Sequence, residues 1–341
     1  MAERVKVCID RVLPGQTMKL QATRGSGANT RAIIPIGKLW MNGTTLRVRF
    51  IGGTSSQQAK AREQAQWWSA VANLKFDFNN APDAELRIAF DPDDGAWSYI
   101  GTDNRGIPFN QPTMNLGFMD GGTAAHEFGH AIGLAHEHQN PAGGIEWNEA
   151  TVLRDLAGPP NNWDAATIRH NVLSKYSVSQ IKGTEFDPNS IMLYFFPGSW
   201  VRSGIGTNAN EVLSAVDKAY IAGAQAYPHD RPTLTDAVEL KVNAIKRTQA
   251  AIGKAGEEDI FRFKVAEGAR HVIDTRGPSD VVMKLFGPDS PTALIAEDDD
   301  SGVDANARII ADLIPGTYYI QVRHYNTERG TGQYSIKVRR Q

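Results

Sequence analysis

The chain has 341 residues, which favours two domains, because single hydrophobic cores rarely grow beyond ~250–300 residues. Its 36 basic and 38 acidic side chains nearly balance, which argues against a nucleic-acid partner or an anionic membrane, and no apolar run approaches the ~20 residues of a membrane-spanning helix. The single cysteine, Cys8, excludes an intramolecular disulfide framework.

The first 37 residues are predicted to form an N-terminal segment ahead of the folded domains. They contain no apolar stretch typical of a secretory signal peptide, so export would need a removed signal or another route. Residues Arg24–Arg31 are rich in glycine and have the composition of a flexible, cleavable linker. We interpret residues 1–37 as a candidate propeptide or latency segment.

The next stretch, residues 38–228, alternates strand-like and helix-like patterns. Asn42-Gly43 predicts the turn of a hairpin over Lys38–Phe50, and apolar residues at three- and four-residue spacing predict a helix over Ser56–Leu74. The further predicted strands are 75–78, 85–90, 95–101 and 113–118, and the further predicted helices are 148–156, 163–173 and 213–226, besides one that starts near Gly122. This order predicts a mixed sheet with a helix packed beneath it.

The polar, proline-containing stretch 229–236 is predicted to be a linker. Seven strand-like runs separated by turn residues follow it, at 260–265, 271–275, 281–286, 293–297, 307–313, 316–324 and 332–338. Residues 237–341 therefore predict a β-sandwich, and the whole chain is predicted to be of the α+β class.

Residues His126–His136 have the spacing H-E-x-x-H-x-x-G-x-x-H. Positions i and i+4 share one face of a helix, so His126 and His130 converge, while Glu127 lies beside that point. A continuing helix would carry His136 about 15 Å away from His126, so Gly133 must let the chain turn back. The alternative is a core helix that happens to be rich in histidine, but the chain has only 8 histidines in all. Three histidines with one open position predict a catalytic zinc site.

This helix resembles the metzincin zinc peptidases, and its surroundings are most similar to the astacin-like branch. His136 is followed by Glu137-His138, Ser190–Tyr194 resembles the S-x-M-x-Y Met-turn, and Ala96–Gly101 resembles a substrate-binding edge strand. The chain departs from animal astacins in lacking both the R-x-D-R-D continuation and the disulfides. The stretch from Asp259 through Ser335 resembles the pre-peptidase C-terminal domain of secreted bacterial proteases.

The resemblance implies roles for the residues around the zinc. Glu127 is expected to be the general base and Tyr194 to assist at the oxyanion, Met192 to form a floor beneath the ligands, and Glu137 to make a supporting hydrogen bond. Met192 and Tyr194 could instead be ordinary core residues, and His138 is predicted to lie on the surface. The residues predicted to bind an extended substrate are Trp97, Ser98, Tyr99 and Ile100.

Two further metal hypotheses remain open at this point. Cys8, or failing it Asp10, could fill the fourth zinc position and keep the protein latent, or Cys8 could be an ordinary thiol. The acidic run Asp298, Asp299 and Asp300, with Asp304, could bind calcium or be a solvated loop, as could Asp274 and Asp280.

The sequence therefore predicts a secreted, monomeric zinc endopeptidase, made as a zymogen, that hydrolyses extended protein or peptide substrates. The alternative from another class is an inactive binding module whose C-terminal domain attaches to a matrix or a cell surface. The intact set of His126, His130, His136 and Glu127 favours the enzyme.

Overall fold

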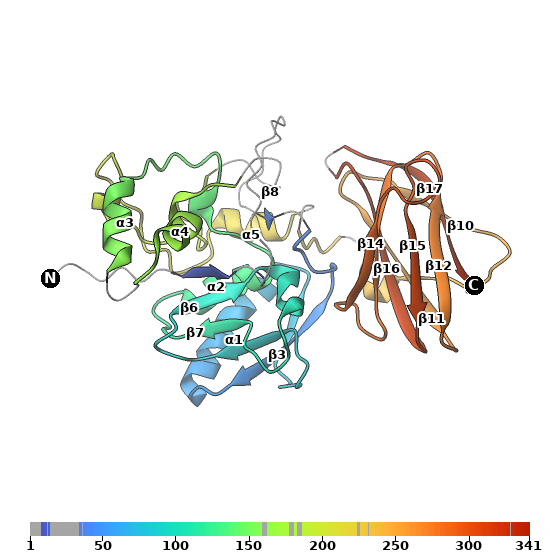
Figure 1. Cartoon of the computed structure of the whole chain (residues 1–341), viewed down its shortest axis with the longest axis horizontal. Helices are drawn as coiled ribbons and strands as arrows, with labels where there is room; N and C mark the ends of the chain where they lie inside the picture. Colours follow the sequence, from blue (N-terminus) through green and yellow to red (C-terminus); the bar gives the residue numbers. More distant parts are fainter. Residues whose placement is uncertain are drawn as a thin grey trace. The chain divides into compact units, whose positions relative to one another are not determined.

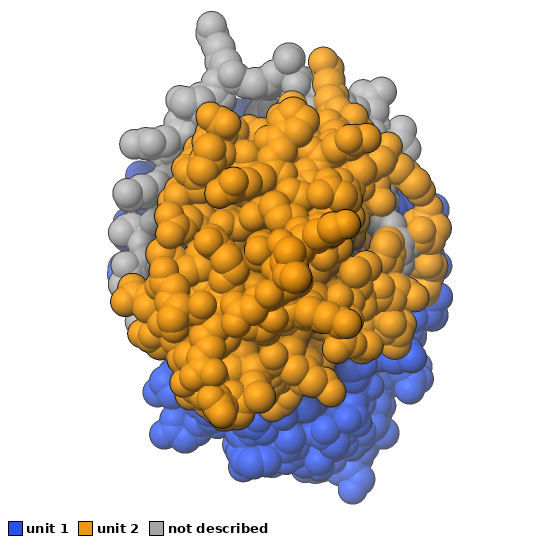
Figure 2. Space-filling view, turned by 90° about the vertical axis from the view of Figure 1, so that its right-hand side faces the viewer, with its two compact units in different colours: residues 1–40, 45–226 blue, residues 41–44, 227–341 orange. Residues whose placement is uncertain are grey.

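The computed structural model describes residues 8–11, 13, 34–35, 37–158, 162–176, 181–182, 186–223, 226–230, 232–327 and 329–341. The chain divides into two compact units, residues 1–40 with 45–226 and residues 41–44 with 227–341 (Figures 1 and 2). This confirms the predicted α+β class, a mixed sheet with helices followed by an all-β sandwich. The predicted linker Arg24–Arg31 lies outside the described residues. Independent folding of residues 38–228 and 237–341 stays a prediction.

The first unit is built on a six-stranded mixed sheet (Figure 1). All neighbouring strands are parallel except one antiparallel pair, β6 with β7. In spatial order the strands are β1 (Ile9–Arg11), β6 (Ala96–Tyr99), β7 (Met114–Leu116), β5 (Leu86–Ala89), β3 (Thr45–Ile51) and β4 (Lys75–Asp77).

Two helices of the first unit pack against each other. Helix α1 (Ser55–Ser69) starts at a capping box between Thr54 and Gln57, and the buried side chains of its inner face include Gln64 and Trp68. The Trp68 indole donates to the Ala125 carbonyl at 2.7 Å, and the Gln64 side chain accepts from the Ala125 amide at 2.9 Å. These bonds fix helix α2 (Thr123–Ala131), which carries the histidine motif, against α1.

The predicted hairpin over Lys38–Phe50 is wrong. The turn at Asn42-Gly43 forms, but residues 38–41 are not a strand, and β3, which follows the turn, pairs in parallel with β4 and β5. The segment before the turn packs on the end of α2 instead, where the Trp40 indole donates to the Ala131 carbonyl at 2.8 Å. The Trp40 indole is buried with its N–H hydrogen-bonded, so the segment before the turn packs against α2 and does not pair with β3.

The remaining elements of the first unit are short. Helix α5 (Ala215–Ile221) starts later and ends earlier than predicted, and a capping box between Ser214 and Asp217 sets its start. The others are β2 (Ile34–Pro35), paired with β8 (Ile181–Lys182), the helices α3 (Glu149–Ala157) and α4 (Ala165–Ile168), and the short helical turns η1 (Gly101–Gly106), η2 (Glu137–Gln139), η3 (Arg169–Leu173) and η5 (Gly198–Trp200).

The second unit confirms the predicted β-sandwich. One sheet has the order β10-β17-β12-β15 and the other the order β14-β13-β16-β11-β9, with a shared core of alternating side chains that includes Phe263, Ile273 and Tyr318. Its strands are β9 (Val238–Glu239), β10 (Thr248–Ile252), β11 (Glu258–Val265), β12 (Ala269–Arg276), β13 (Val281–Phe286), β14 (Leu294–Asp298), β15 (Arg308–Leu313), β16 (Gly316–His324) and β17 (Gly332–Arg340), after a short turn η6 (Leu234–Asp236). No helix in the described part of the chain is long and apolar enough to cross a membrane.

A buried arginine fastens the loop between β6 and β7 to the sheet. The Arg87 side chain is 0% exposed and donates to the carbonyls of Ala84, Ile107 and Gln111 at 2.7–2.9 Å. Burial lowers the Arg87 pKa to about 10, so the guanidinium stays charged at neutral pH. These three carbonyls therefore share one guanidinium group as a hydrogen-bond donor.

We expect Arg87→Met to lower the free energy of unfolding by about 2–4 kcal/mol, because several carbonyls lose their donors. Arg49→Met is the matched control, since Arg49 is paired with Arg87 in the sheet register and its side chain makes an exposed 3.4 Å bond to the Pro82 carbonyl. Urea unfolding of both variants measures the difference. Equal losses would contradict the assigned role of Arg87.

Candidate metal centre

Helix α2 presents two histidines of the motif with their rings already oriented. His126 Nδ1 lies 2.7 Å from the Ile191 carbonyl and His130 Nδ1 lies 2.8 Å from the Leu134 carbonyl. A carbonyl can only accept, so both Nδ1 atoms carry a proton, and in the neutral ring Nε2 is then an acceptor. The two Nε2 atoms are 3.1 Å apart. Outer hydrogen bonds of this kind are the usual orienting partners of metal-binding histidines.

The third histidine arrives because the chain reverses after the helix. Gly133 has a φ of +110°, in the region that favours glycine, and an added Cβ there would lie 3.1 Å from Leu39 Cδ2. The Gly133 amide still bonds to the His130 carbonyl, after which the chain turns back. His136 Nε2 then lies 2.9 Å from His130 Nε2. The structure thus brings His126, His130 and His136 together as predicted.

These three nitrogens fit a zinc ion. Tetrahedral coordination at Zn–N distances of about 2.0–2.1 Å places ligand nitrogens about 3.3 Å apart. The observed separations of 2.9 and 3.1 Å are close to that value. Burial, helped by the neighbouring histidines, holds the His136 pKa well below its usual range, so its ring is neutral and able to coordinate.

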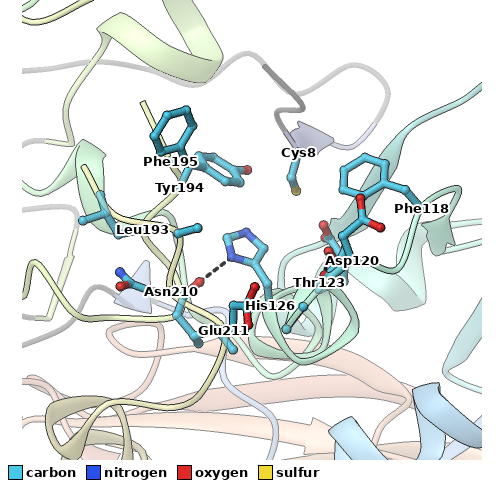
Figure 3. Close-up of a pocket in the computed structure, with 15 residues that line it drawn as sticks. Cys8, Phe118, Asp120, Thr123, His126, Leu193, Tyr194, Phe195, Asn210 and Glu211 are labelled. Atoms are coloured by element: carbon cyan, nitrogen blue, oxygen red, sulfur yellow. Dashed lines mark hydrogen bonds between the residues drawn. The ribbon is translucent and has the colours of Figure 1, made fainter. Parts of the chain in front are cut away.

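Tyr194 contacts the histidines of the motif, and Glu127 lines the same pocket as His126. The Tyr194 hydroxyl contacts His136 Nε2, and its ring lies 4.9 Å from that of His126. Glu127 is fully buried, and it lines a pocket of about 170 Å³ together with His126 and Tyr194. In Figure 3 the side chains of Cys8, His126 and Tyr194 point toward one common space. A carboxylate and a phenol therefore line the same pocket as His126.

The Met-turn lies directly beneath the helix. Met192 is buried, and its sulfur would be 2.5 Å from a Cβ added to Gly129. The turn is held by Asp217, whose carboxylate accepts from the Ser190 hydroxyl at 2.6 Å and the Ile191 amide at 2.8 Å. Burial raises the Asp217 pKa, and the hydrogen bonds partly offset this. The Ile191 carbonyl in turn orients His126.

Glu137 connects the third histidine to the same turn. Its amide donates to the Met192 carbonyl at 3.0 Å, and its Oε1 accepts from the Asn140 side chain and the Asp187 amide, both at 3.0 Å. Burial raises the Glu137 pKa to about 8. The predicted supporting hydrogen bond is thus present. Glu137 holds the chain after His136 rather than facing the space shared by the ligands.

The prediction that His138 lies on the surface is wrong. His138 is 0% exposed, and its Nε2 lies 2.9 Å from the Asn171 carbonyl. Its ring packs edge-on against Trp147 and Phe196, with centroids 6.1 and 5.1 Å away. Later parts of the chain fold over this residue, which local sequence cannot reveal.

The N-terminal segment reaches the same centre. Cys8 is buried, and its sulfur and the ligand nitrogens of His126, His130 and His136 all lie within 4.8 Å of one another. In the described part of the chain this is the only group of three or more His, Cys, Asp or Glu side chains arranged to hold a metal. The side chain of Asp10, the alternative fourth ligand, lies outside the described residues.

The strand predicted to bind substrate already has a neighbour. β1 pairs in parallel with β6, with Ile9 opposite Trp97 and Arg11 opposite Tyr99. Ser98 is buried within β6, and Ile100 belongs to a small buried cluster with two other side chains. The free edge expected along Trp97–Ile100 is therefore covered by residues of the N-terminal segment in the full chain.

The acidic run of the second unit gains no support as a calcium site. The Asp298 carboxylate accepts from the Arg308 amide at 2.7 Å and from the Ser301 side chain and amide. This carboxylate thus closes its own loop. Asp299 and Asp300 follow it directly, and charge repulsion from Asp299 raises the pKa of Asp300.

The other acidic candidate, Asp274, is engaged by cations of the protein itself. Its carboxylate accepts from Arg247 and from Arg339, each at 2.6 Å. Two guanidinium groups already neutralise this side chain, so its surroundings favour an ion-pair network over a bound cation.

Sequence reasoning missed residues that hold the site without contacting a metal, above all Asp217 and Gln64. Ser214-x-x-Asp217 is a capping-box pattern, so the start of α5 was recognisable. No local pattern reveals that the same carboxylate reaches the Met-turn, because Asp217 and Ser190 are 27 residues apart.

Comparison with known proteins gives two family matches. The family model for the astacin peptidases matches residues 34–197, and the model described as "Bacterial pre-peptidase C-terminal domain" matches residues 257–324. A solved structure of myroilysin is 35% identical, covers 58% of this chain and 99% of that chain, and has a TM-score of 0.55. A second, titled "Crystal structure of myroilysin", is 34% identical and covers 65% and 100%, at 0.46. The pre-peptidase C-terminal domain of a Bacillus anthracis collagenase is 20% identical and covers 32% and 99%, at 0.28.

We expect Gly129→Ala to destabilise the protein by about 1–3 kcal/mol, although alanine ordinarily stabilises a helix relative to glycine. The new methyl group would meet Met192 Sδ at 2.5 Å and Trp68 Cζ2 at 3.0 Å. Gly144→Ala is the control, since nothing lies within 4 Å of its added Cβ. Thermal unfolding and zinc content measured on both variants check this. A more stable Gly129→Ala protein would show that the helix does not press on the Met-turn.

Proposed function

The chain belongs to the astacin family of zinc-dependent metallopeptidases, and from this premise we propose that it is an endopeptidase that cleaves extended protein or peptide substrates with Glu127 as general base. The observation that carries this proposal is the convergence of three imidazole rings, with nitrogens 2.9 and 3.1 Å apart, beside a fully buried carboxylate. A binding module that had lost its activity would not need Glu127 at this point.

The proposed mechanism assigns one task to each side chain. When bound by His126, His130 and His136, zinc supplies Lewis acidity and lowers the pKa of a coordinated water toward ~7. Glu127 takes the proton of the attacking water and later passes it to the leaving amine. The Tyr194 hydroxyl moves from His136 toward the substrate and donates to the developing oxyanion.

We expect Glu127→Gln to lower kcat/KM by at least ~10²-fold while zinc remains bound, because glutamine keeps the shape of the side chain but cannot accept the proton. Cleavage of a quenched fluorescent peptide measures the rate, and metal analysis measures the zinc. Full activity in a zinc-loaded Glu127→Gln protein would exclude Glu127 as general base.

We further propose that residues 1–37 keep the enzyme latent. Two observations support this: the Cys8 sulfur lies with the three histidine nitrogens, and β1 occupies the edge of β6 where a substrate strand would add. A cysteine beside a bound zinc ionises and coordinates it, so Cys8 would exclude the attacking water. Because β1 covers the predicted substrate strand, substrate and segment compete for one place.

We expect Cys8→Ala to raise peptidase activity at least several-fold, and cleavage within Arg24–Arg31 to do the same, since each weakens the hold of the segment on the site. The rate is measured in full-length, zinc-loaded protein. The test fails if both changes leave the rate unaltered and the Cys8 thiol reacts freely with an alkylating reagent in the zinc-loaded protein.

We also propose that the enzyme acts outside the cell, on the basis of its second unit. The match to a bacterial pre-peptidase C-terminal domain over residues 257–324 supports action outside the cell. Attachment of this unit to a matrix or surface, a monomeric state, and calcium binding at Asp298–Asp300 stay predictions.

A further inference from the structure

The last residue of β1 is held by contacts that strand pairing does not require. The Arg11 guanidinium nitrogen Nη2 donates to Asp94 Oδ1 at 2.7 Å and to Asp94 Oδ2 at 2.9 Å. Its central carbon lies 3.8 Å from the centroid of the Trp97 ring. The guanidinium is therefore held by a carboxylate and by an aromatic face at once, which are the two contacts that favour arginine over other side chains.

The receptor for this guanidinium is built without help from Arg11. The Trp97 indole donates to Asp94 Oδ2 at 2.9 Å and orients the carboxylate. The Trp97 ring packs edge-on against Tyr99, with centroids 5.9 Å apart. The loop that carries Asp94 is fixed by the Asn115 side chain, which donates to the carbonyls of Asp91 and Gly95 at 2.9 and 2.6 Å. Removing Arg11 would leave a preformed site with a net negative charge.

The position of this site places it in the substrate groove. Cys8 lies at the metal centre, and Arg11 follows three residues later along a strand paired with β6. Three residues of extended chain span about 10 Å. A side chain in the place of Arg11 would thus belong to a residue about three positions from the bond under attack.

We propose that Asp94 and Trp97 form a subsite for an arginine side chain of the peptide substrate, about three residues from the scissile bond, which Arg11 occupies in the latent chain. This inference rests on the proposed peptidase function. In this proposal the N-terminal segment occupies the substrate groove at two positions: Cys8 lies at the metal centre, and Arg11 lies in the guanidinium site. Citrulline, which has the shape of arginine without its charge, would lose the ion pair with Asp94.

The test uses full-length, zinc-loaded protein with Cys8→Ala and Arg11→Ala, so that the segment lacks both anchors. Substrates are peptides with one arginine moved stepwise through each position on both sides of the cleaved bond, each paired with its citrulline counterpart. We expect kcat/KM for arginine to exceed that for citrulline about tenfold at one position near the third residue. Adding Asp94→Asn should bring the ratio to about one.

The matched control for this variant is Asp93→Asn, which should leave the arginine-to-citrulline ratio unchanged. Asp93 is the adjacent exposed acid, and the contacts that hold the Arg11 guanidinium come from Asp94 and Trp97. A loss of preference in Asp93→Asn as large as that in Asp94→Asn would show that general negative charge, and not the built site, selects arginine.

A second measurement does not depend on turnover. With Glu127→Gln in the same background, fluorescence polarisation gives the Kd of each labelled peptide, and the same arginine preference and the same dependence on Asp94 are expected. An arginine-to-citrulline ratio near one at every position, or a preference that survives Asp94→Asn, would overturn the subsite. Cleavage of the citrulline peptides in that case leaves the peptidase function standing. Failure to cleave any peptide would instead count against the peptidase function, and the Kd ratio would still decide the subsite.

Discussion

The structure depends on bringing three imidazole nitrogens together in a buried space, with His130 Nε2 lying 3.1 Å from His126 Nε2 and 2.9 Å from His136 Nε2. A helix alone can align only His126 and His130, so the chain must stop the helix and return with His136. Gly133 permits the return, and the hydrogen bonds from His126 and His130 to carbonyls fix which nitrogen faces inward. Much of the first unit supports this arrangement, because side chains of α1 and the Ile191 carbonyl of the Met-turn all make hydrogen bonds to α2.

Two buried carboxylates, Asp217 and Glu137, support the metal centre without being ligands. Each one holds a different part of the chain near the histidines. Asp217 satisfies a hydroxyl and two backbone amides, and so it closes the Met-turn on the start of α5. Burial raises the pKa of Glu137 to about 8. Such supporting residues make the ligand geometry rigid before a metal arrives.

The parts of this site that the sequence predicts are local, and the parts it misses are not. The spacing from His126 to His136 predicts the ligands, the proposed base and the chain reversal within eleven residues, and the capping residues mark the helix starts. The pairing of β1 with β6 joins residues almost ninety apart, and nothing in three residues of sequence encodes it. The failed hairpin has the same origin: the turn forms, but the distant contact of Trp40 with Ala131 decides what precedes it. The burial of His138 likewise depends on residues that follow it by dozens of positions.

The two anchors of the N-terminal segment bear on how such a chain would become active. In the proposed latent form, Cys8 and Arg11 are joined by a short strand, so loss of one anchor leaves the other at high effective concentration. Cutting the chain within Arg24–Arg31 would remove the covalent link but not these contacts. The segment would then leave at a rate set by the zinc–sulfur bond, the Asp94 ion pair and the β1–β6 hydrogen bonds together. A substrate that carries arginine competes at the second anchor and meets a vacated metal only after Cys8 has left. Cleavage therefore precedes activation in this arrangement, and the dissociation rate of the N-terminal segment sets the interval between them.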